Sequence, residues 1–312
     1  MGLDAAAMQF LCAAKSMGVD FTDMAMIGRQ VLVLPDLAPL KRIFSVLGVT
    51  CNAEEFRRAN YYGESFFSLL GAKQIASVDA SSYEEATDLQ DMNLPLDEAL
   101  RERFTAVYDG GSLEHIFNIP QALKNCMEMV KVGGHFLQLT IANNFMGHGF
   151  WQFSPEVIYR VFTPENGYRV EAVLLHEVKP GGAWYLVQDP QQFGDRVELC
   201  NRDSTYIVSV ARRLATADIF ASPPQQADYT AAWNRRADAA PPPARRRDMP
   251  WPFIPRSLKR LIPWPVKGAV KGGLKRLRDL TKPPDFPPPG RNFQQACYRR
   301  ITEAALLHGK LA

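Results

Sequence analysis

Residues 104 to 117 read FTAVYDGGSLEHIF, a run of β-forming side chains that ends in an acid, two glycines and a polar turn. A helical pattern follows from Pro120 to Lys131, and a second β-type run extends from His135 to Ile141. Two strands that are joined through a helix lie parallel in one sheet. This stretch therefore predicts a βαβ unit whose first strand ends at Asp109.

The same alternation extends on both sides of this unit. Short β-type runs alternate with helical patterns from residue 24 to about residue 214, which predicts an α/β fold with helices on both faces of a parallel sheet. We expect a doubly wound, mostly parallel, seven-stranded sheet. Its strands are expected at Met24 to Ile27, Gln74 to Asp79, Thr87 to Leu89, Ala106 to Asp109, His135 to Ile141, Val170 to Val178 and Thr205 to Ala211. Helices are expected at Leu37 to Leu47, Glu54 to Leu70, Pro120 to Lys131, Pro155 to Val161 and Phe293 to Leu307.

Residues that follow the strands deserve a separate interpretation, because the ligand crevice of such a sheet lies outside the carboxyl ends of its strands. Gly28 lets the backbone approach a ligand closely, or simply forms a turn. Asp79 can accept two hydrogen bonds from a ribose diol, or cap a helix. The segment Asp88 to Asn93 offers an acid and an apolar neighbour to an adenine, or is a polar loop. Together the strand ends predict a nucleoside site.

Over about residues 74 to 141, the chain resembles the class I S-adenosylmethionine-dependent methyltransferases, in the branch with an acid and a Leu-Glu-His turn after the fourth strand. Asp109 to Asn118 and Asn143 to Phe150 are also similar to segments of a bacterial group associated with surface-polysaccharide synthesis. The resemblance implies S-adenosylmethionine as cofactor. It also implies site roles: Gly28 in the cofactor loop, Asp79 on the ribose, Asp91 and Met92 beside the adenine, and Asp109 with Gly110 at the edge of the methyl-donor pocket.

Methyl transfer from a sulfonium is an in-line displacement, so a general base is needed only where the acceptor is a hydroxyl or a protonated amine. His148 is a candidate base, since it follows the fifth expected strand in a glycine-rich loop; it can equally order that loop by bonding a backbone carbonyl. Glu114 and His115 are the other catalytic candidates, or they cap the next helix and line the pocket. The aromatic residues Phe145, Phe150, Trp151 and Phe153 form an acceptor platform or belong to the core.

Two features depart from the methyltransferase pattern. Gly28 is followed by Arg29 and Gln30 rather than by further glycines, and residues 29 to 78 have room for two helices. Either an insertion covers the cofactor or the site is degenerate. The first hypothesis is therefore an enzyme that methylates an oxygen of a glycan or other small acceptor, and the second is a catalytically silent module that binds a nucleoside or a partner. A dinucleotide-dependent dehydrogenase is disfavoured because no G-x-G-x-x-G follows the first strand.

Composition limits the remaining classes. The net charge of +3 is too small to indicate a nucleic-acid binder, and the Asn/Asp-Pro-Pro-Tyr pattern of base methylation is missing after the fourth strand. The five cysteines are widely spaced and form no C-x-x-C pair, so we expect neither a disulfide framework nor a metal site. No secretion signal or bilayer-spanning run is found. These features favour the cytoplasm.

The C-terminal part of the chain has a different composition. We divide the chain into an N-terminal helical lead-in (1 to 23), the α/β domain (24 to 214), a Pro-rich basic segment (215 to 291) and a C-terminal helix (292 to 312). Residues 241 to 282 contain twelve Lys or Arg against two acids. Residues 251 to 282 are a candidate for peripheral contact with the inner face of the membrane. The alternatives are a solvated linker or a binding site for nucleic acid or another acidic partner.

Overall fold

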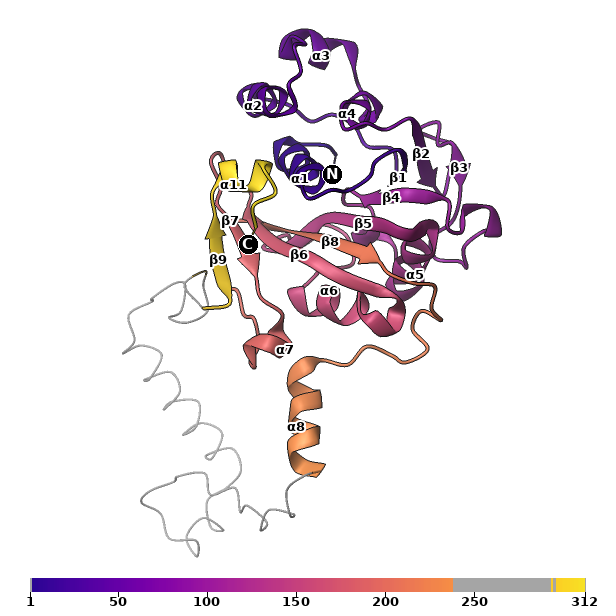
Figure 1. Cartoon of the computed structure of the whole chain (residues 1–312), viewed down its shortest axis with the longest axis vertical. Helices are drawn as coiled ribbons and strands as arrows, with labels where there is room; N and C mark the ends of the chain where they lie inside the picture. The colour runs from indigo at the N-terminus through magenta and orange to yellow at the C-terminus, as the bar shows by residue number, and fades with distance from the viewer. Residues whose placement is uncertain (1, 238–292, 294–295, 312) are drawn as a thin grey trace, which may run out of the picture.

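The structure is a computed structural model of the whole chain, and it describes residues 2 to 237, 293 and 296 to 311 (Figure 1). The basic segment 251 to 282, with its expected membrane contact, lies outside these described residues. No helix in the described part of the chain is long and apolar enough to cross a membrane.

One mixed sheet forms the centre of the fold, with its strands in the order β3-β2-β1-β4-β5-β8-β6-β7-β9. Neighbours from β3 to β5 are parallel, and those from β5 to β9 are antiparallel. The strands are β1 (Asp23–Ile27), β2 (Gln74–Asp79), β3 (Asp88–Leu89), β4 (Phe104–Asp109), β5 (Val130–Asn143), β6 (Tyr168–Glu177), β7 (Trp184–Val187), β8 (Thr205–Arg213) and β9 (Tyr298–Ile301). All seven expected strands are present.

The expectation of a seven-stranded, mostly parallel sheet is wrong in two respects. The sheet has nine strands, and four of its eight pairings are antiparallel. The two additional strands, β7 and β9, have four residues each, and β9 forms the edge of the sheet. In β9 the buried residues Tyr298 and Ile301 are three positions apart, which is the spacing of a helical face rather than of a strand. For this reason the sequence predicts a helix over residues 293 to 307, whereas the structure has β9 followed by the shorter helix α11 (Glu303–Leu307).

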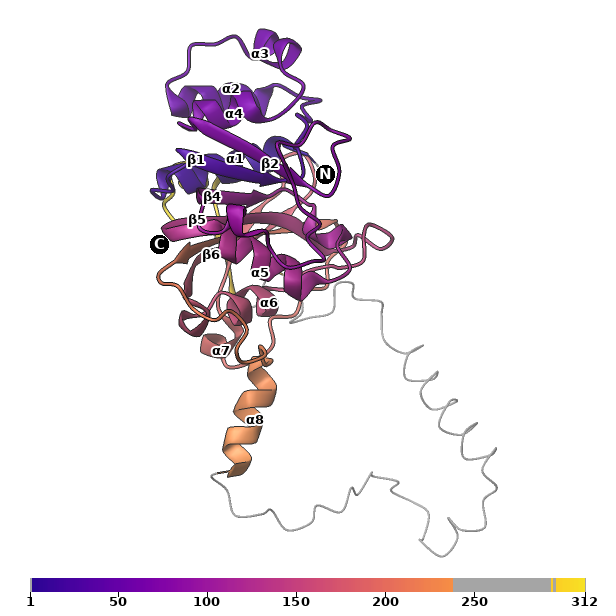
Figure 2. The same ribbon diagram turned by 90° about the vertical axis from the view of Figure 1, so that its right-hand side faces the viewer.

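Helices cover both faces of the sheet (Figures 1 and 2). Alternate residues of β1 point to opposite sides: Met24 and Met26 pack with α1 (Ala5–Ser16), α2 (Ala38–Leu47), α4 (Glu64–Leu69) and α11, while Ala25 and Ile27 pack with α5 (Ile119–Met129) and α6 (Pro155–Val161). The sheet is thus the middle of three layers. Two further helices follow later in the chain: α7 (Pro190–Phe193) after β7, and α8 (Ala227–Ala237) after β8.

The helix expected over Glu54 to Leu70 is two helices, α3 (Ala53–Ala59) and α4. Between them, Tyr62 forms an isolated antiparallel bridge with Val31, and the Gly63 N–H donates to the Gln30 carbonyl at 2.8 Å. These pairings with the loop after β1 compete with helical hydrogen bonds at the same backbone groups. As a result the helix is interrupted where the chain passes this loop.

The two ends of the described chain meet beside the sheet. Helix α11 lies against α1, where the Gln9 amide donates to Glu303 at 2.7 Å and the Ser16 hydroxyl donates to the Leu307 carbonyl at 2.8 Å. Leu306 is fully buried in the same layer. The N-terminal helix α1 therefore packs in the core of the fold.

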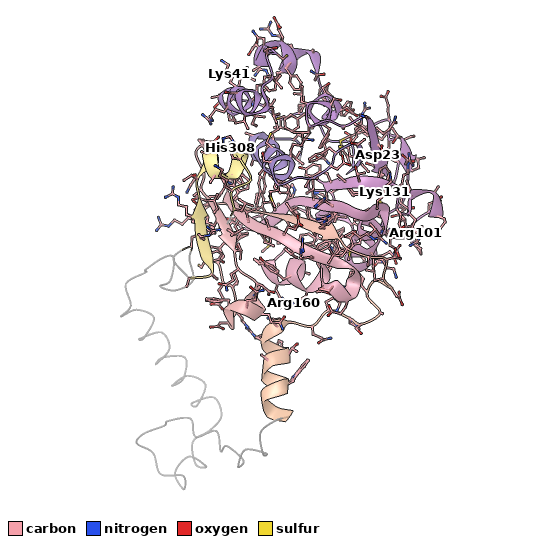
Figure 3. All side chains as sticks on the ribbon, in the orientation of Figure 1. Asp23, Lys41, Arg101, Lys131, Arg160 and His308 are labelled. Atoms are coloured by element: carbon pink, nitrogen blue, oxygen red, sulfur yellow. The ribbon has the colours of Figure 1, made fainter. Side chains whose placement is uncertain are left out.

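An ion pair ties the βαβ unit to the first strand on the side away from the carboxyl ends. The Lys131 ammonium lies 2.8 Å from the carboxylate of Asp23, which begins β1 (Figure 3). Lys131 is the basic residue that precedes the Gly-Gly turn of the methyltransferase-like pattern. Its contact therefore supports the fold and lies at the opposite edge from the candidate site.

Candidate active site

The strand order locates the crevice. The order runs outward in one direction from β1 through β2 to β3, and in the other from β4 to β5. The carboxyl ends of β1 and β4 therefore lie at the topological switch point, where α/β sheets bind their ligands. In the sixth position stands β8, which is antiparallel to β5. This differs from the sheet of dinucleotide-binding dehydrogenases, in which a sixth parallel strand takes that position.

Gly28 joins the loops after β1 and β4. Its φ is +69°, and a Cβ at this position would lie 2.7 Å from the Ser112 hydroxyl oxygen. That hydroxyl donates to the Ile27 carbonyl at 2.6 Å, and the Gly28 N–H donates to the Val78 carbonyl at 2.8 Å. Both the positive φ and the close contact require glycine. The group that approaches the Gly28 backbone closely is therefore the Ser112 side chain of the loop after β4, whereas the sequence predicted a ligand there.

A cavity with a volume of about 420 Å³ opens at these strand ends. Four of the six expected cofactor residues line it: Gly28, Asp79, Asp91 and Met92. Of the expected catalytic residues, His115 lines it directly. The structure thus brings together, at one rim, the residues that follow β1, β2 and β3 and the turn after β4.

The Asp79 carboxylate faces this cavity with little else to bind. It accepts one hydrogen bond, from the Ser81 N–H at 3.2 Å, and no other hydrogen bond to it is present among the described residues. Its Oδ2 lies 3.8 Å from the position that a Cβ of Gly28 would occupy. A half-buried carboxylate with a free oxygen beside a backbone turn can accept hydrogen bonds from a diol.

Asp91 and Met92 form the far wall. Asp91 accepts two hydrogen bonds from Asn93, one from the N–H and one from the side-chain amide, both at 2.9 Å. These bonds lower the pKa of the Asp91 carboxyl, so it is ionised at neutral pH. The Met92 side chain is buried. Asn93 also accepts from the N–H of Asn118, which connects this wall to the start of α5.

Asp109 and Gly110 do not line the cavity. Asp109 is fully buried, and its carboxylate accepts from the N–H groups of Ser112 and Leu113 at 2.8 and 3.2 Å and from the Gln138 amide at 3.0 Å. Burial raises the pKa of Asp109, and the nearby Glu114 carboxylate raises it further. Gly110 packs against Gln30, whose Oε1 lies 2.5 Å from the position of a glycine Cβ. Both residues shape the turn that presents Ser112 and His115.

The loop after β1 is fixed by its non-glycine residues. The Arg29 guanidinium lies 2.7 Å from Glu64 at the start of α4 and 3.1 Å from Glu85, and it stacks over the Tyr62 ring at 3.8 Å. The Gln30 amide donates back to the Ile27 carbonyl at 3.1 Å. Among the described residues, none from α2 or α3 lines the cavity. The additional helices between β1 and β2 therefore leave it uncovered.

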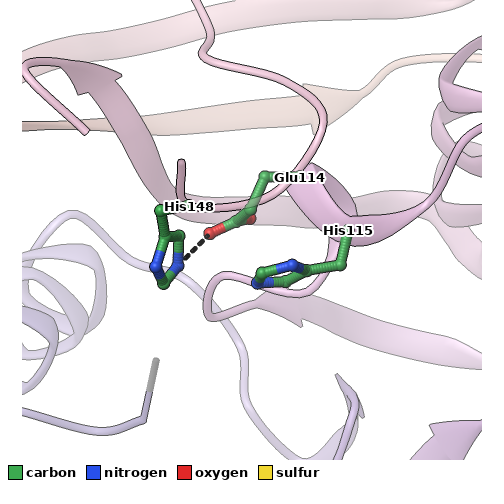
Figure 4. A group of neighbouring side chains, drawn as sticks. All are labelled: Glu114, His115 and His148. Atoms are coloured by element: carbon green, nitrogen blue, oxygen red, sulfur yellow. Dashed lines mark ion pairs between the residues drawn. The ribbon is translucent and has the colours of Figure 1, made fainter. Parts of the chain in front are cut away.

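Glu114, His115 and His148 gather at the inner end of the site (Figure 4), with one potential ligand atom of each within 4.8 Å of the others. Glu114 is fully buried, and the Thr140 hydroxyl donates to its Oε2 at 2.9 Å. Its Oε1 lies 3.8 Å from His148 Nε2, and neither atom has a hydrogen-bond partner among the described residues. We refer to these three residues as the Glu-His-His cluster.

Burial sets the charge preferences of the cluster. Desolvation raises the pKa of Glu114, which favours its neutral form. Burial and the neighbouring His148 lower the pKa of His115, whose ring centroid lies 5.0 Å from that of His148. A cation placed among the three side chains would favour the ionised form of Glu114, which reverses its preference, and would favour the neutral form of His115 still further.

The loop that carries His148 is held against the backbone of Glu114. The Glu114 carbonyl accepts from the N–H groups of Phe150 and Trp151 at 2.8 and 3.3 Å. Gly149 has a φ of +76°, and a Cβ there would lie 2.7 Å from the same carbonyl oxygen. No hydrogen bond of the His148 ring to a backbone carbonyl is present in the described part of the chain. The loop is ordered by its backbone, and the ring is left for the cluster.

The aromatic residues expected to form one platform are divided among different places. Phe145 stacks on Tyr206 at 5.5 Å, while Phe150 is 65% exposed and contacts the exposed ring of Phe117 at 5.7 Å. Trp151 and Phe153 line a second, mostly apolar cavity of about 510 Å³ between α5 and α6. The exposed pair of Phe117 and Phe150 lies in the two segments that carry His115 and His148.

Some residues of the site were missed in the sequence, among them three polar side chains. Ser112 lines the cavity, and Gln138 and Thr140 hold the carboxylates of Asp109 and Glu114 from β5. A signal for the last two was present, since they are polar side chains two positions apart in an apolar strand and so share one face.

No protein-family model and no curated protein matches the chain. Among solved structures, a protein from Bacillus halodurans that is provisionally assigned as a methyltransferase matches 69% of this chain and 100% of its own, at 12% identity and a TM-score of 0.37. A provisionally assigned S-adenosylmethionine-dependent methyltransferase from Listeria monocytogenes matches 67% of this chain and 99% of its own, at 11% identity and a TM-score of 0.34. The branched-chain polyamine synthase of Thermus thermophilus matches 71% of this chain and 58% of its own, at 13% identity and a TM-score of 0.36. Because these scores are low, the function proposed below rests on the chain's own residues.

Proposed function

We propose that the protein is an S-adenosylmethionine-dependent methyltransferase that acts on an oxygen of its acceptor. The observation that supports this most directly is the convergence of Gly28, Asp79, Asp91 and Met92 on one cavity at the switch point of the sheet. These residues come from three different strand ends, which is the arrangement that a nucleoside needs.

The cavity fits the cofactor in size and in chemistry. Its volume of about 420 Å³ lies within the range of small-molecule sites. Asp79 would accept hydrogen bonds from the ribose hydroxyls, and Asp91 and Met92 would contact the amine and the ring face of the adenine. The cofactor's sulfonium end would then lie towards Ser112 and His115, which line the same cavity. When bound, S-adenosylmethionine supplies a methyl group that leaves the sulfur as the acceptor oxygen bonds to it.

Removal of the acceptor's proton falls to the Glu-His-His cluster. His115 lines the cavity, and the ring of His148, whose side chain is 37% exposed, has its centroid 5.0 Å from that of His115, so a hydroxyl bound beside His115 would lie near both imidazoles. The buried Glu114 carboxylate behind them can stabilise the positive charge that develops on an imidazole. A site with this cluster is suited to an acceptor that must lose a proton, and this favours a hydroxyl.

A glycan is the acceptor class that we favour. The exposed rings of Phe117 and Phe150 stand next to the cluster at 5.7 Å from each other. Aromatic faces of this kind stack on the apolar faces of sugar rings. The sequence resemblance to methyltransferases of surface-polysaccharide synthesis agrees with this choice. The proposed reaction is therefore methylation of a sugar hydroxyl.

Calorimetric titration of the full chain with S-adenosylmethionine and S-adenosylhomocysteine tests the proposal. We expect micromolar binding of both, and a loss of at least tenfold in affinity in Asp79→Ala, because a hydrogen bond to a charged group is worth about 1.5–3 kcal/mol. Asp218→Ala is the matched control, since Asp218 is 82% exposed and lies outside the cavity. Absence of binding by the unaltered chain would overturn the enzyme in favour of a catalytically silent module, which the fixed loop at Arg29 and Gln30 would suit.

A further inference from the structure

We infer that the Glu-His-His cluster is a binding site for one divalent transition-metal cation. Its three potential ligand atoms lie within 4.8 Å of one another and come from two segments, the turn after β4 and the loop after β5. The expectation that the chain has no metal site considered the cysteines, and no cysteine takes part here. Two imidazoles and one carboxylate are instead the donors.

The unpaired atoms carry the inference. Glu114 Oε1 and His148 Nε2 are both buried, and both lack a hydrogen-bond partner among the described residues. Buried polar atoms are almost always paired, so two that face each other at 3.8 Å need an explanation. This separation is too long for a hydrogen bond. It suits two ligands of one cation, whose bonds of about 2.0–2.2 Å allow ligand atoms to stand up to roughly 4 Å apart.

The surroundings orient the ligands as they do in metal sites. The Thr140 hydroxyl holds Glu114 Oε2 at 2.9 Å and so leaves Oε1 directed at His148 (Figure 4). Such outer hydrogen bonds fix the rotamer of a ligating carboxylate. The loop that carries His148 is fixed to the Glu114 carbonyl through Phe150 and Gly149. Rotation of the His115 and His148 rings would bring the three ligand atoms, which lie within 4.8 Å of one another, to the separations that a cation requires.

The donor set and its exposure define the class of cation. Imidazole ligands favour zinc, cobalt, nickel or iron over magnesium and calcium, which prefer oxygen. Glu114 closes the site on the protein side, whereas His115 lines the cavity and the His148 side chain is 37% exposed. Three protein ligands with open positions towards a cavity are typical of a catalytic rather than a structural site.

The role of the cation rests on the function proposed above. At the open positions it would bind the acceptor's hydroxyl oxygen and make its proton more acidic. The O–H bond then breaks and the proton passes to water, while the oxygen keeps the electron pair that forms the new bond to the methyl carbon. The electron pair of the methyl–sulfur bond remains on the sulfur. With the cation bound, His115 and His148 act as its ligands and no longer as the base described under the proposed function, and the cation activates the oxygen.

Metal binding is tested without any cofactor. The full chain is dialysed against a chelator and titrated with ZnCl₂ by calorimetry and with CoCl₂ by visible absorption. We expect the chain to bind one equivalent of either metal, and the visible spectrum of the cobalt complex to be that of a cobalt ion with a low coordination number. Glu114→Gln and His148→Gln should each weaken binding more than tenfold, and Thr140→Ala, which removes only the outer hydrogen bond, by about tenfold. His308→Gln is the matched control, because His308 is an exposed histidine outside the cluster.

The outcomes separate this inference from the proposed function. Titration of the cofactor into chelator-treated protein is a second, independent experiment. If the protein binds S-adenosylmethionine but binds neither zinc nor cobalt, the cation site alone is overturned. Metal binding without cofactor binding would support the cation site and overturn the methyltransferase. If Glu114→Gln fails to fold, His148→Gln, which changes a partly exposed loop residue, keeps the test decisive. Equal zinc affinity of His148→Gln and the unaltered chain would overturn the site.

Discussion

The Gln138 side-chain amide donates to the Asp109 carboxylate at 3.0 Å in the interior of the protein. Two positions further along the same strand, the Thr140 hydroxyl donates to Glu114 at 2.9 Å. One face of β5 therefore holds both buried carboxylates of the turn after β4. Because that turn also presents Ser112 and His115 to the cavity, the geometry of the candidate site depends on side chains of a strand that does not line it.

Gln138→Leu should lower the free energy of unfolding by about 1–3 kcal/mol, because the substitution leaves an oxygen of the buried Asp109 without its partner. Urea denaturation measures the effect. Gln74→Leu is the control, since it places the same side chain at an exposed position of β2. Equal stability of Gln138→Leu and Gln74→Leu would show that the Asp109 carboxylate does not need this bond.

Gly28→Ala and Gly48→Ala form a matched pair. Their φ angles are +69° and +67°, but a Cβ on Gly28 meets the Ser112 oxygen at 2.7 Å, whereas one on Gly48 meets nothing within 4 Å. Both variants should lose about 1 kcal/mol of stability from the positive φ. We expect Gly28→Ala to lose more than this, and to lose cofactor affinity as well. Thermal unfolding and calorimetry check both effects, and an identical loss in the two variants would contradict the crowding at Gly28.

The strands of the central sheet could be predicted because their apolar runs are short and bounded by turn residues. Gln74 to Asp79 agrees with β2 at both ends. The edge strand β9 could not, since its buried residues Tyr298 and Ile301 have helical spacing and its partner β7 is distant in sequence. Pairing with a distant strand overrides a local pattern.

For the candidate site, the sequence was sufficient to predict several of the residues at the strand ends that line the cavity. Gly28, Asp79, Asp91 and Met92 line the cavity because the carboxyl ends of parallel strands meet at one edge of a sheet. The orientation of Asp109 was not predictable, because Gln138 on another strand turns it inward. The gathering of His148 with Glu114 likewise depends on how the loop after β5 packs on the turn after β4.

Leu306→Ala should lower the free energy of unfolding by about 2–5 kcal/mol, the range for a leucine removed from a core. Leu306 of α11 is fully buried beside α1, so its loss leaves a cavity between the two ends of the described chain. Leu214→Ala removes the same atoms from a residue that is 42% exposed, and should cost much less. Urea unfolding compares the two. Similar losses would mean that α11 adds little to the core.

His176 should make the protein less stable in acid. Burial lowers its pKa from 6.5 to about 4, while its ring stacks on Trp184 at 4.2 Å. The unfolded chain therefore takes up a proton below pH 6.5 that the folded chain refuses until about pH 4, so this contribution to stability is present above that window and is lost as the pH falls through it. Relative to His176→Phe, which keeps the stacking and cannot titrate, the loss should reach about 3 kcal/mol. Parallel stability curves of the two proteins from pH 7 to pH 4 would contradict it.

Asp79 makes the most specific prediction about the ligand, since its free oxygen is the acceptor that we assign to the ribose diol. S-adenosylhomocysteine should bind at least about 100-fold more tightly than its 2′,3′-dideoxy analogue, because the analogue lacks two hydroxyls and each hydrogen bond between a hydroxyl and a carboxylate is worth about 1.5–3 kcal/mol.

In Asp79→Asn the ratio of the two affinities should fall towards one, because the charged acceptor is gone and the hydroxyls then contribute little to binding. The two ligands and the two proteins together form a double-mutant cycle. Asp218→Asn, at an exposed position away from the cavity, should keep the full preference. A general loss of affinity in Asp79→Asn with the preference unchanged would mean that Asp79 only shapes the loop after β2, and that the ribose lies elsewhere. The measurement is calorimetric competition between the two ligands on each of the three proteins. It distinguishes a direct contact from a structural effect. Only with a direct contact does the effect of removing the hydroxyls depend on which residue is present at position 79.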